Sequence, residues 1–410
     1  YDYQEQLLQE IRTIRRVIAN VHDASKISLK REDSSQFLTL QEYRWNVLTQ
    51  NLSLKSKMFR HSLRLTIAIV FTYLLGYTLE IQNAYWIMLT VIVIMRPNYG
   101  LTKERSKDRV LGTIIGAIIA FCIVLLTQNE IVYAVLAFIS LVLSFSLIQQ
   151  NYKSAAAFVT ISIIFLYSFI NPNAFEVIQY RILDTVIGAI IAVVANYIIL
   201  PTWEADNLRQ IVLNALKMNK KYLLAAQVLY EDPKAQKMDY NLARKDAFLA
   251  VSNLNASFQR LTQDPKSKQR EFQLIYEIVT INQTMISAIA AIGNFIINHK
   301  TTPASEDFKK LIYTISGNLQ WSADILEHIE IEKEVSVEKN EDAQDKLFDT
   351  YKKLSHLRDE NIKKGNKEID TETLHQLQEA YLISNHLNWL KSLSESLKKA
   401  IGKYSSIILE

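Results

Sequence analysis

Cysteine, histidine and proline are scarce in this 410-residue sequence, which contains one cysteine, seven histidines and six prolines. The single cysteine, Cys122, lies within an apolar run, which excludes a disulfide framework and a cysteine-based metal site. The histidines are scattered without the spacing of metal ligands, so we expect no metal and no cofactor. The sequence also lacks a P-loop, an HExxH motif and a GxSxG motif. We therefore expect no enzymatic activity and no ATP-driven step on this chain.

Charge and length give expectations about the partners of the protein and about its number of structural units. The net charge of +4 arises from 46 Lys and Arg against 42 Asp and Glu, dispersed along the chain, so we expect no nucleic-acid partner. A chain of 410 residues exceeds one ordinary globular core, so two or three structural units are expected. The sequence starts at Tyr1 and shows no signal peptide, and we expect it to be part of a longer protein.

Apolar residues are concentrated between positions 59 and 201, whereas the sequence after Pro201 has the charge pattern of a soluble protein. A bilayer core about 30 Å thick requires roughly 17 to 25 largely apolar residues per helix. Six apolar runs predict six transmembrane helices, at residues 62–79, 84–95, 110–126, 131–148, 155–170 and 182–200. The second run has only twelve residues, so it is either a broken helix or extends into its flanks.

Lysine and arginine near the ends of these runs predict their orientation, because cytoplasmic loops carry the positive excess. Basic residues gather before the first run, after the second and after the fourth: Lys55, Lys57, Arg60, Arg96, Lys103, Arg105, Lys107, Arg109 and Lys153. The connections at 80–83 and 127–130 have none, and the last connection has only Arg181. Six buried helices of a soluble protein would not give this alternation. We expect a multi-pass protein of a bacterial inner membrane, surrounded by membrane lipids, with both chain ends in the cytoplasm.

A near-duplicate sequence opens the third and the sixth run. Residues 109–120 read RVLGTIIGAIIA and residues 181–192 read RILDTVIGAIIA, with nine of twelve positions identical. The motif RPN at 96–98 is echoed by NPN at 171–173. The repeat unit therefore contains three helices, and two such units must lie in the membrane with opposite orientation, as in many secondary transporters. The predicted fold is all-α, with six transmembrane helices as a 3+3 inverted repeat plus a cytoplasmic helical bundle.

Ionisable residues inside these runs are candidates for a substrate pathway. Arg109 and Arg181 occupy equivalent repeat positions, and arginines from both units would suit an anionic substrate. Arg181 lies one turn before Asp184, a spacing that suits an ion pair, and Asp184 marks either a functional site or a buried pair. The positive-inside rule is an alternative explanation for Arg109, and Arg64 would most simply extend to the cytoplasmic surface.

Small and neutral polar residues in the same helices have two interpretations. Gly112, Gly116 and Gly188 predict close helix packing of the GxxxG type. Tyr85 and Trp86, at the start of the second run, are typical of an aromatic belt at the membrane interface. Three further side chains either line a pathway or form hydrogen bonds to the backbone across helices: Thr113, Thr185 and Asn196.

The polar parts of the sequence also have a helical pattern. We predict a cytoplasmic helical lead-in at 1–55, a six-helix transmembrane domain at 56–202 and a cytoplasmic helical domain at 203–410. Residues 285–297 are apolar but too short to span, which predicts a core helix. The lysine- and glutamate-rich stretch at 332–370 is typical of a solvated face and loop. No active site is visible in this part, and regulation or dimerisation is its expected role.

Three stretches resemble a known family: FRHSLR at 59–64, YWIMLTVIVIMRPNYGLTKERSKDRVLGTIIG at 85–116 and RILDTVIG at 181–188. With these motifs, residues 55–202 resemble the fusaric acid resistance (FUSC-like) family, specifically the C-terminal half of its YccS/YhfK type of bacterial inner membrane protein. Arg96 departs from the Gln that such relatives often carry before the proline. The resemblance implies efflux or conduction of organic anions, with aromatic carboxylates among the candidate substrates.

Three functions remain open at this point. The first is a secondary active exporter of organic anions, with proton coupling through Asp184. The second is an anion channel in which the same arginines form a selectivity ring. The third is a non-transporting membrane scaffold whose cytoplasmic bundle binds a partner. A six-helix unit is small for a pathway, so we expect a homodimer or a pairing with a second membrane half.

Overall fold

The computed structural model describes residues 51–81, 84–127, 129–168, 174–232, 237–269, 271–299, 301–327, 341–363 and 371–409, together with Arg15 and Thr49. The chain divides into two units, Tyr1–Gln50 and Asn51–Glu410. The predicted lead-in at 1–55 lies almost wholly outside the described residues, as do the motif at 171–173 and part of the stretch at 332–370. Within the described ranges every regular element is a helix.

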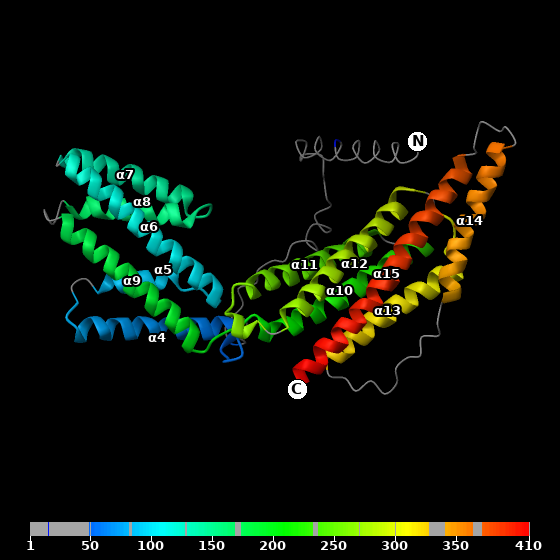
Figure 1. The fold of residues 1–410 in the computed structure, drawn as a ribbon, viewed down its shortest axis with the longest axis horizontal. Coiled ribbons are helices and arrows are strands. Elements are labelled where there is room, and N and C mark those ends of the chain that lie inside the picture. Colours follow the sequence, from blue (N-terminus) through cyan, green and yellow to red (C-terminus); the bar gives the residue numbers. More distant parts are fainter. Residues whose placement is uncertain are drawn as a thin grey trace. The chain divides into compact units, whose positions relative to one another are not determined.

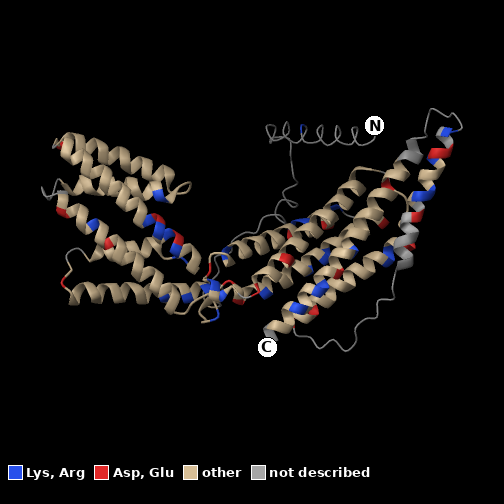
Figure 2. Cartoon of the chain, in the orientation of Figure 1, with Lys and Arg blue, Asp and Glu red and all other residues tan. Residues whose placement is uncertain are grey.

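Six helices cover the apolar half of the chain (Figure 1). They are α4 (Lys57–Thr78), α5 (Tyr85–Ile94), α6 (Tyr99–Leu126), α7 (Glu130–Leu147), α8 (Tyr152–Ser168) and α9 (Ala174–Ile198). Helix α6 begins well before the predicted span at 110–126, because the basic stretch ahead of that span continues the same helix. Figure 2 shows charged residues gathered near the start of α6 and sparse along α7 and α8.

Four of these helices, α4, α6, α7 and α9, are long and apolar enough to cross a membrane. Helix α5 has 10 residues and α8 has 17, which at 1.5 Å per residue gives about 15 Å and about 26 Å against a core of about 30 Å. The chain leaves the helix at Met95, two residues before Pro97, whose ring disfavours helical backbone ahead of it. The prediction of six transmembrane spans is therefore not confirmed, whereas a multi-pass membrane protein is supported.

Two apolar clusters hold these helices together. One contains Ala117 and Ala120 of α6 together with side chains of α7 and α8. The other contains Ala189 and Ala192 of α9 together with side chains of α4 and α5. Ala189 and Ala192 are the repeat equivalents of Ala117 and Ala120. The third helix of each sequence repeat thus packs against the first two helices of the other repeat.

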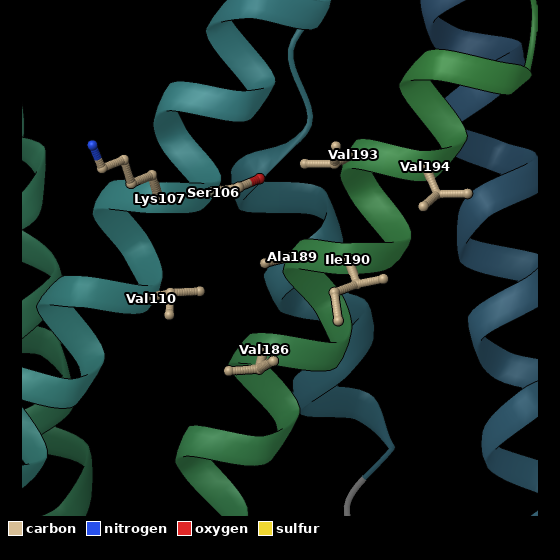
Figure 3. A pocket seen from close by; sticks show the side chains of 8 residues that line it. All are labelled: Ser106, Lys107, Val110, Val186, Ala189, Ile190, Val193 and Val194. Atoms are coloured by element: carbon tan, nitrogen blue, oxygen red, sulfur yellow. The ribbon is translucent and has the colours of Figure 1, made fainter.

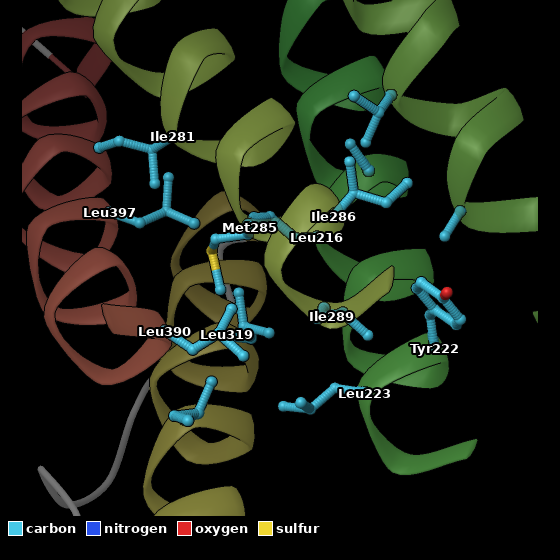
Figure 4. Close-up of a cluster of buried hydrophobic side chains, with 14 of the residues drawn as sticks. Leu216, Tyr222, Leu223, Ile281, Met285, Ile286, Ile289, Leu319, Leu390 and Leu397 are labelled. Carbon is cyan, nitrogen blue, oxygen red and sulfur yellow. The ribbon is translucent and has the colours of Figure 1, made fainter. Parts of the chain in front are cut away.

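The C-terminal bundle consists of α10 (Ala205–Glu231), α11 (Lys237–Leu261), α12 (Phe272–Asn298), α13 (Glu306–Glu327), α14 (Glu341–Lys363) and α15 (Thr371–Leu409), with a 3₁₀ turn at Lys266–Lys268. Met285 and Ile289 of α12 pack in its core against Leu216 of α10, Leu319 of α13 and Leu390 of α15 (Figure 4). With 27 residues, α12 is the fifth described helix that is long and apolar enough to cross a membrane. The predicted length at 285–297 was therefore too short, because the helix continues through polar residues, but its apolar face does lie in the core.

Candidate functional site

Glycines set the spacing of the helices that carry the candidate residues. At Gly116 of α6 an added Cβ would lie 2.4 Å from the carbonyl oxygen of Ala157 in α8, and Gly112, one turn earlier, is equally close to that helix. At Gly188 of α9 an added Cβ would lie 2.8 Å from the side chain of Thr90 in α5. Real Cβ atoms do not approach other atoms so closely. These glycines therefore allow α6 to pack on α8 and α9 to pack on α5.

Arg181 of α9 is buried, and none of its three side-chain nitrogens has a hydrogen-bond partner. Its guanidinium carbon lies 4.3 Å from the centre of the Trp86 ring, in the first turn of α5. Stacking on an indole offsets part of the cost of burying the charge, but it leaves the in-plane N–H groups of the guanidinium without acceptors. Carboxylate and phosphate groups can accept two such N–H donors side by side. The geometry therefore suits an anion.

Asp184 lies one turn after Arg181 on the same helix and is also buried. Its Oδ2 has no hydrogen-bond partner, and the structure shows no ion pair between the two side chains, both of which are described. The expected ion pair is absent because the Arg181 guanidinium is turned toward Trp86 of the neighbouring helix. The charge of Asp184 still attracts Arg181 through space. Both groups thus keep hydrogen-bonding capacity that the protein does not use.

Arg109, the repeat equivalent of Arg181, is buried on α6, and its Nε has no hydrogen-bond partner. Tyr152 at the start of α8 is its polar neighbour, and the same ring lies 4.3 Å from the guanidinium carbon of Arg105. Arg109 is close enough to Arg181 for their charges to repel each other. The two arginines therefore act in one electrostatic region between α6 and α9, and together they create a field that favours an anion.

The two threonines that repeat with these arginines form hydrogen bonds to helices. Thr185 Oγ1 donates to the carbonyl oxygen of Arg181 at 2.8 Å, one turn back on α9. Thr160 Oγ1 of α8 lies 3.4 Å from Thr113 Oγ1 of α6 and bonds to its own helix at Ala156. Thr185 therefore bonds to the backbone of its own helix and Thr113 lies against a side chain of α8, and neither contact is the predicted hydrogen bond to backbone across helices.

Arg64 and Asn196 belong to a separate polar cluster at the C-terminal end of α9. Arg64 is fully buried and donates to the carbonyl oxygens of Ile199 at 2.8 Å, Pro97 at 3.2 Å and Leu200 at 2.5 Å, and to Asn196 Oδ1 at 2.5 Å. The guanidinium thereby satisfies carbonyl groups that follow the last turn of α9. The prediction that Arg64 extends to the membrane surface is wrong, because these oxygens replace water around its charge.

Asn196 is fully engaged in the same cluster. Its Nδ2 donates to the carbonyl oxygen of Arg96 at 2.8 Å and to Thr102 Oγ1 at 2.6 Å. Thr102 Oγ1 also accepts the backbone N–H of Arg96 at 2.9 Å. The cluster ties α9 to the link between α5 and α6. Arg64 and Asn196 therefore have a structural role in this arrangement and leave little hydrogen-bonding capacity for a substrate.

A buried carboxylate connects the membrane helices to the C-terminal bundle. Glu204, immediately before α10, accepts hydrogen bonds from Asn98 Nδ2 at 2.5 Å, Ser257 Oγ at 2.8 Å and Arg260 Nε at 2.9 Å. Burial acts to raise the pKa of Glu204, but the hydrogen bonds from Arg260 and Ser257 and the charge of Lys57 outweigh it and hold the pKa below its usual value. Glu204 therefore stays ionised and keeps its donors in place.

Asp264, at the end of α11, lies beside this carboxylate. Its Oδ2 accepts the backbone N–H of Glu204 at 3.0 Å. Burial raises the pKa of Asp264 to about 6, an effect that this hydrogen bond opposes. The junction thus combines one carboxylate that holds its charge firmly with one that takes up a proton near neutral pH.

The sequence pattern does not indicate the contacts of several of these residues. Trp86 fitted an interface belt, and no local pattern indicates that it stacks on Arg181 from another helix. Glu204 and Thr102 lie outside the apolar runs, so nothing in their spacing marks them as partners of buried groups. In the part of the chain that the structure describes, no three His, Cys, Asp or Glu side chains gather as a metal site would require.

The sequence model of the family described as fusaric acid resistance protein-like matches residues 67–195, which extend from α4 to α9. The inner membrane protein YccS of Escherichia coli (strain K12) is 28% identical over 249 residues, covering 61% of this chain and 35% of that protein. The uncharacterized protein YhfK of the same organism is 27% identical over 256 residues, covering 62% and 36%. The resemblance expected from the motifs is confirmed.

An uncharacterized protein of Haemophilus influenzae is 24% identical over 284 residues, covering 69% of this chain and 39% of that protein. The chain thus spans little more than a third of the length of these curated relatives.

Proposed function

We propose that this protein, whose membrane helices match the fusaric acid resistance protein-like family, exports organic anions across a bacterial inner membrane as a secondary active transporter. Aromatic carboxylates are among the candidate substrates. The proposal includes the topology predicted from the basic loops, with both chain ends in the cytoplasm. It also includes a homodimer or a pairing with a second membrane half, because a six-helix unit is small for a pathway. Energy would come from an ion gradient rather than from a reaction on this chain.

The observation that carries this proposal is the unpaired, buried guanidinium of Arg181. An arginine inside a bilayer is costly unless it is paired or faces a polar pathway, and such residues by default mark routes for substrates or ions. Among the described residues Arg181 has no acceptor, has Trp86 on its face and has Arg109 near enough to add a second positive charge. A bound carboxylate would supply the missing acceptors.

The packing of the repeats supports alternating access. Ala117 and Ala189, equivalent in sequence, lie in two separate clusters, each of which combines a third helix with the first two helices of the other repeat. We infer that the two clusters are the inverted halves predicted from the sequence. In such an arrangement the clusters can exchange conformations about the α6–α9 pair, and the short α5 is the type of discontinuous helix that borders midplane sites.

The test is transport by the full-length protein reconstituted in liposomes, with a panel of radiolabelled aromatic and aliphatic carboxylates and an imposed pH gradient. We expect gradient-dependent flux in the wild type, loss of at least about tenfold in Arg181→Gln, and partial retention in Arg181→Lys, which keeps the charge but not the bidentate geometry. Arg244→Gln is the matched control, because Arg244 also lies over an aromatic ring, Phe248, but on the C-terminal bundle.

Two results would refute the proposal. One is the absence of flux for every carboxylate in the panel, which would favour a membrane scaffold. The other is wild-type flux in Arg181→Gln. Single-channel anion currents that persist without a proton gradient would instead favour an anion channel.

A further inference from the structure

A groove of about 390 Å³ lies between α6 and α9 (Figure 3), and Arg181 is not among the residues that line it. Its apolar wall comes from both helices: Val110, Val186, Ala189, Ile190, Val193 and Val194. Two polar residues, Ser106 and Lys107, line the groove at the basic end of α6. In Figure 3 Ser106 lies beside Val193 and Val110 lies nearer Val186, so the two helices run in opposite directions. The groove therefore has an apolar length and, at one end, a lysine whose side chain extends away from α9; we call this the cationic end (Figure 3).

The cationic end extends beyond the groove itself. Lys103 precedes Lys107 by one helical turn, both side chains are exposed, and helical spacing places them on one face of α6. One turn earlier, the Tyr99 ring lies 5.8 Å from the ring of Tyr197 on α9, and Trp203 lies 5.7 Å from each. Lysine with tyrosine and tryptophan is the composition of a membrane interface at headgroup depth.

Ser106 adds a specific polar group to this end. Ser106 is 6% exposed, and its buried Oγ has no hydrogen-bond partner among the residues that the structure describes. The side chain lines the groove between the lysine and the apolar wall, where a hydroxyl can donate to an ester or phosphate oxygen. An unpartnered hydroxyl between a cation and an apolar wall matches the order of groups in a phospholipid, from phosphate to glycerol ester to acyl chain.

The sequence repeat provides an internal comparison. The positions equivalent to Ser106, Lys107 and Val193 are Ile178, Gln179 and Phe121. At the opposite end of the α6–α9 pair the lysine and serine are therefore replaced, and Phe121 provides a large ring that contacts Phe175. The two repeats thus contain similar helices, but lysine and serine are present at only one end of the α6–α9 pair. Such asymmetry fits a ligand that is present in one leaflet, and anionic lipid at a basic membrane face has that distribution.

We propose that this groove binds an anionic phospholipid of the surrounding bilayer, with its phosphate at Lys107 and Lys103, its ester region at Ser106 and one acyl chain along Val110 and Val193. A second copy of the chain is a poorer occupant. If two copies paired through this face about an axis along the membrane normal, their lysines would meet at the same depth and repel. A phosphate neutralises them instead.

The test is native mass spectrometry of the purified full-length protein titrated with phosphatidylglycerol or phosphatidylcholine of the same acyl chains. We expect the wild type to retain phosphatidylglycerol preferentially, by about fivefold for each lysine near the phosphate. Lys103→Gln with Lys107→Gln should remove this preference. Val193→Phe, which introduces the residue of the equivalent repeat position, should lower retention of both lipids.

Two matched variants serve as controls, namely Lys153→Gln, another exposed lysine at the start of a membrane helix, and Val142→Phe, on the exposed face of α7. Both should bind as the wild type does. The proposal would be overturned if the wild type showed no headgroup preference or if the groove variants matched the wild type. It would also be overturned if Val194→Cys, in a Cys122→Ser background, formed disulfide-linked dimers in the membrane. The readout is lipid binding, so its outcome is independent of whether the protein transports anions.

Discussion

Two buried arginines in one set of membrane helices illustrate opposite uses of the same side chain. Arg64 donates to four acceptors, three of them backbone carbonyls beside the ends of α5 and α9. Arg181 is buried to a similar degree but has only the face of Trp86. Burying a guanidinium is costly when it has no hydrogen-bond acceptors. Arg64 therefore stabilises the fold through its acceptors, whereas Arg181 would gain its missing acceptors from a bound anion. Burial alone therefore does not identify a charged residue as functional, and its hydrogen-bond partners must also be known.

The largest difference in stability should appear between the variants in which Arg64 or Arg181 is exchanged for glutamine. Arg64→Gln leaves several buried carbonyl groups without donors and should lower the stability of the membrane unit by about 3 to 5 kcal/mol. Arg181→Gln removes an unpaired charge and should leave stability unchanged or raise it. Thermal unfolding of the full-length protein in detergent measures both. Equal destabilisation by the two changes would remove the distinction between them.

A smaller effect is expected at the glycines that bring the repeats together. Gly116→Ala forces α6 away from Ala157 and should cost about 1 to 3 kcal/mol, and Gly188→Ala should act similarly against Thr90. Gly317→Ala is the control, because nothing lies within 4 Å of its added Cβ, and a helical alanine should stabilise by up to about 1 kcal/mol. The same thermal unfolding measurement should give opposite signs. A neutral Gly116→Ala would show that close α6–α8 packing is not required.

Asp184 distinguishes binding from coupling at the Arg181 site. Asp184→Asn removes a carboxylate without a hydrogen-bond partner at its Oδ2, so we expect the fold to remain intact. If Asp184 carries the coupled proton, flux driven by a pH gradient should fall about tenfold, equivalent to about 1.4 kcal/mol. Exchange of labelled for unlabelled anion without a gradient should persist. Asp108→Asn, beside Arg109, is the control. Unchanged gradient dependence in Asp184→Asn would exclude it as the coupling group.

The smallest effect should lie at the junction outside the membrane. Because burial raises the pKa of Asp264 to about 6 from 3.8, its ionised form destabilises the folded state, so stability is greatest below about 4 and falls as pH rises to about 6. The full shift corresponds to about 3 kcal/mol, which screening reduces to about 1 kcal/mol. Asp264→Asn should therefore gain stability over the wild type at pH 8 but not below about pH 4. Asp239→Asn, exposed on α11, should show no such change.

The helices themselves were largely predictable, because apolar runs and helical spacing are local properties. The runs at 110–126 and 131–148 lie within or nearly coincide with α6 and α7. The short run at 84–95 matches α5, which ends ahead of Pro97. The length of α12 was not predicted correctly, because this helix continues through polar residues that the bundle tolerates at its surface.

The candidate site was only partly predictable. The repeat identified Arg109, Arg181 and Asp184 as residues to examine, and the structure describes all three as buried. Their partners depend on contacts between helices that are distant in sequence. Trp86 is 95 positions from Arg181, and Asn196 is 132 from Arg64. No periodicity in one sequence encodes such pairings, so the difference between a satisfied and an unsatisfied arginine became visible only in the fold.

The most direct test of the central claim is whether organic anions stabilise the protein through Arg181. A ligand that binds only the folded state at about 100 times its Kd adds about 2.7 kcal/mol of stability. The measurement is the thermal unfolding midpoint of wild type and Arg181→Gln in increasing concentrations of a carboxylate, at constant ionic strength. We predict that the midpoint of the wild type rises and that of Arg181→Gln does not. An equal rise in both proteins, or in neither, would contradict the assignment of Arg181 as the anion site.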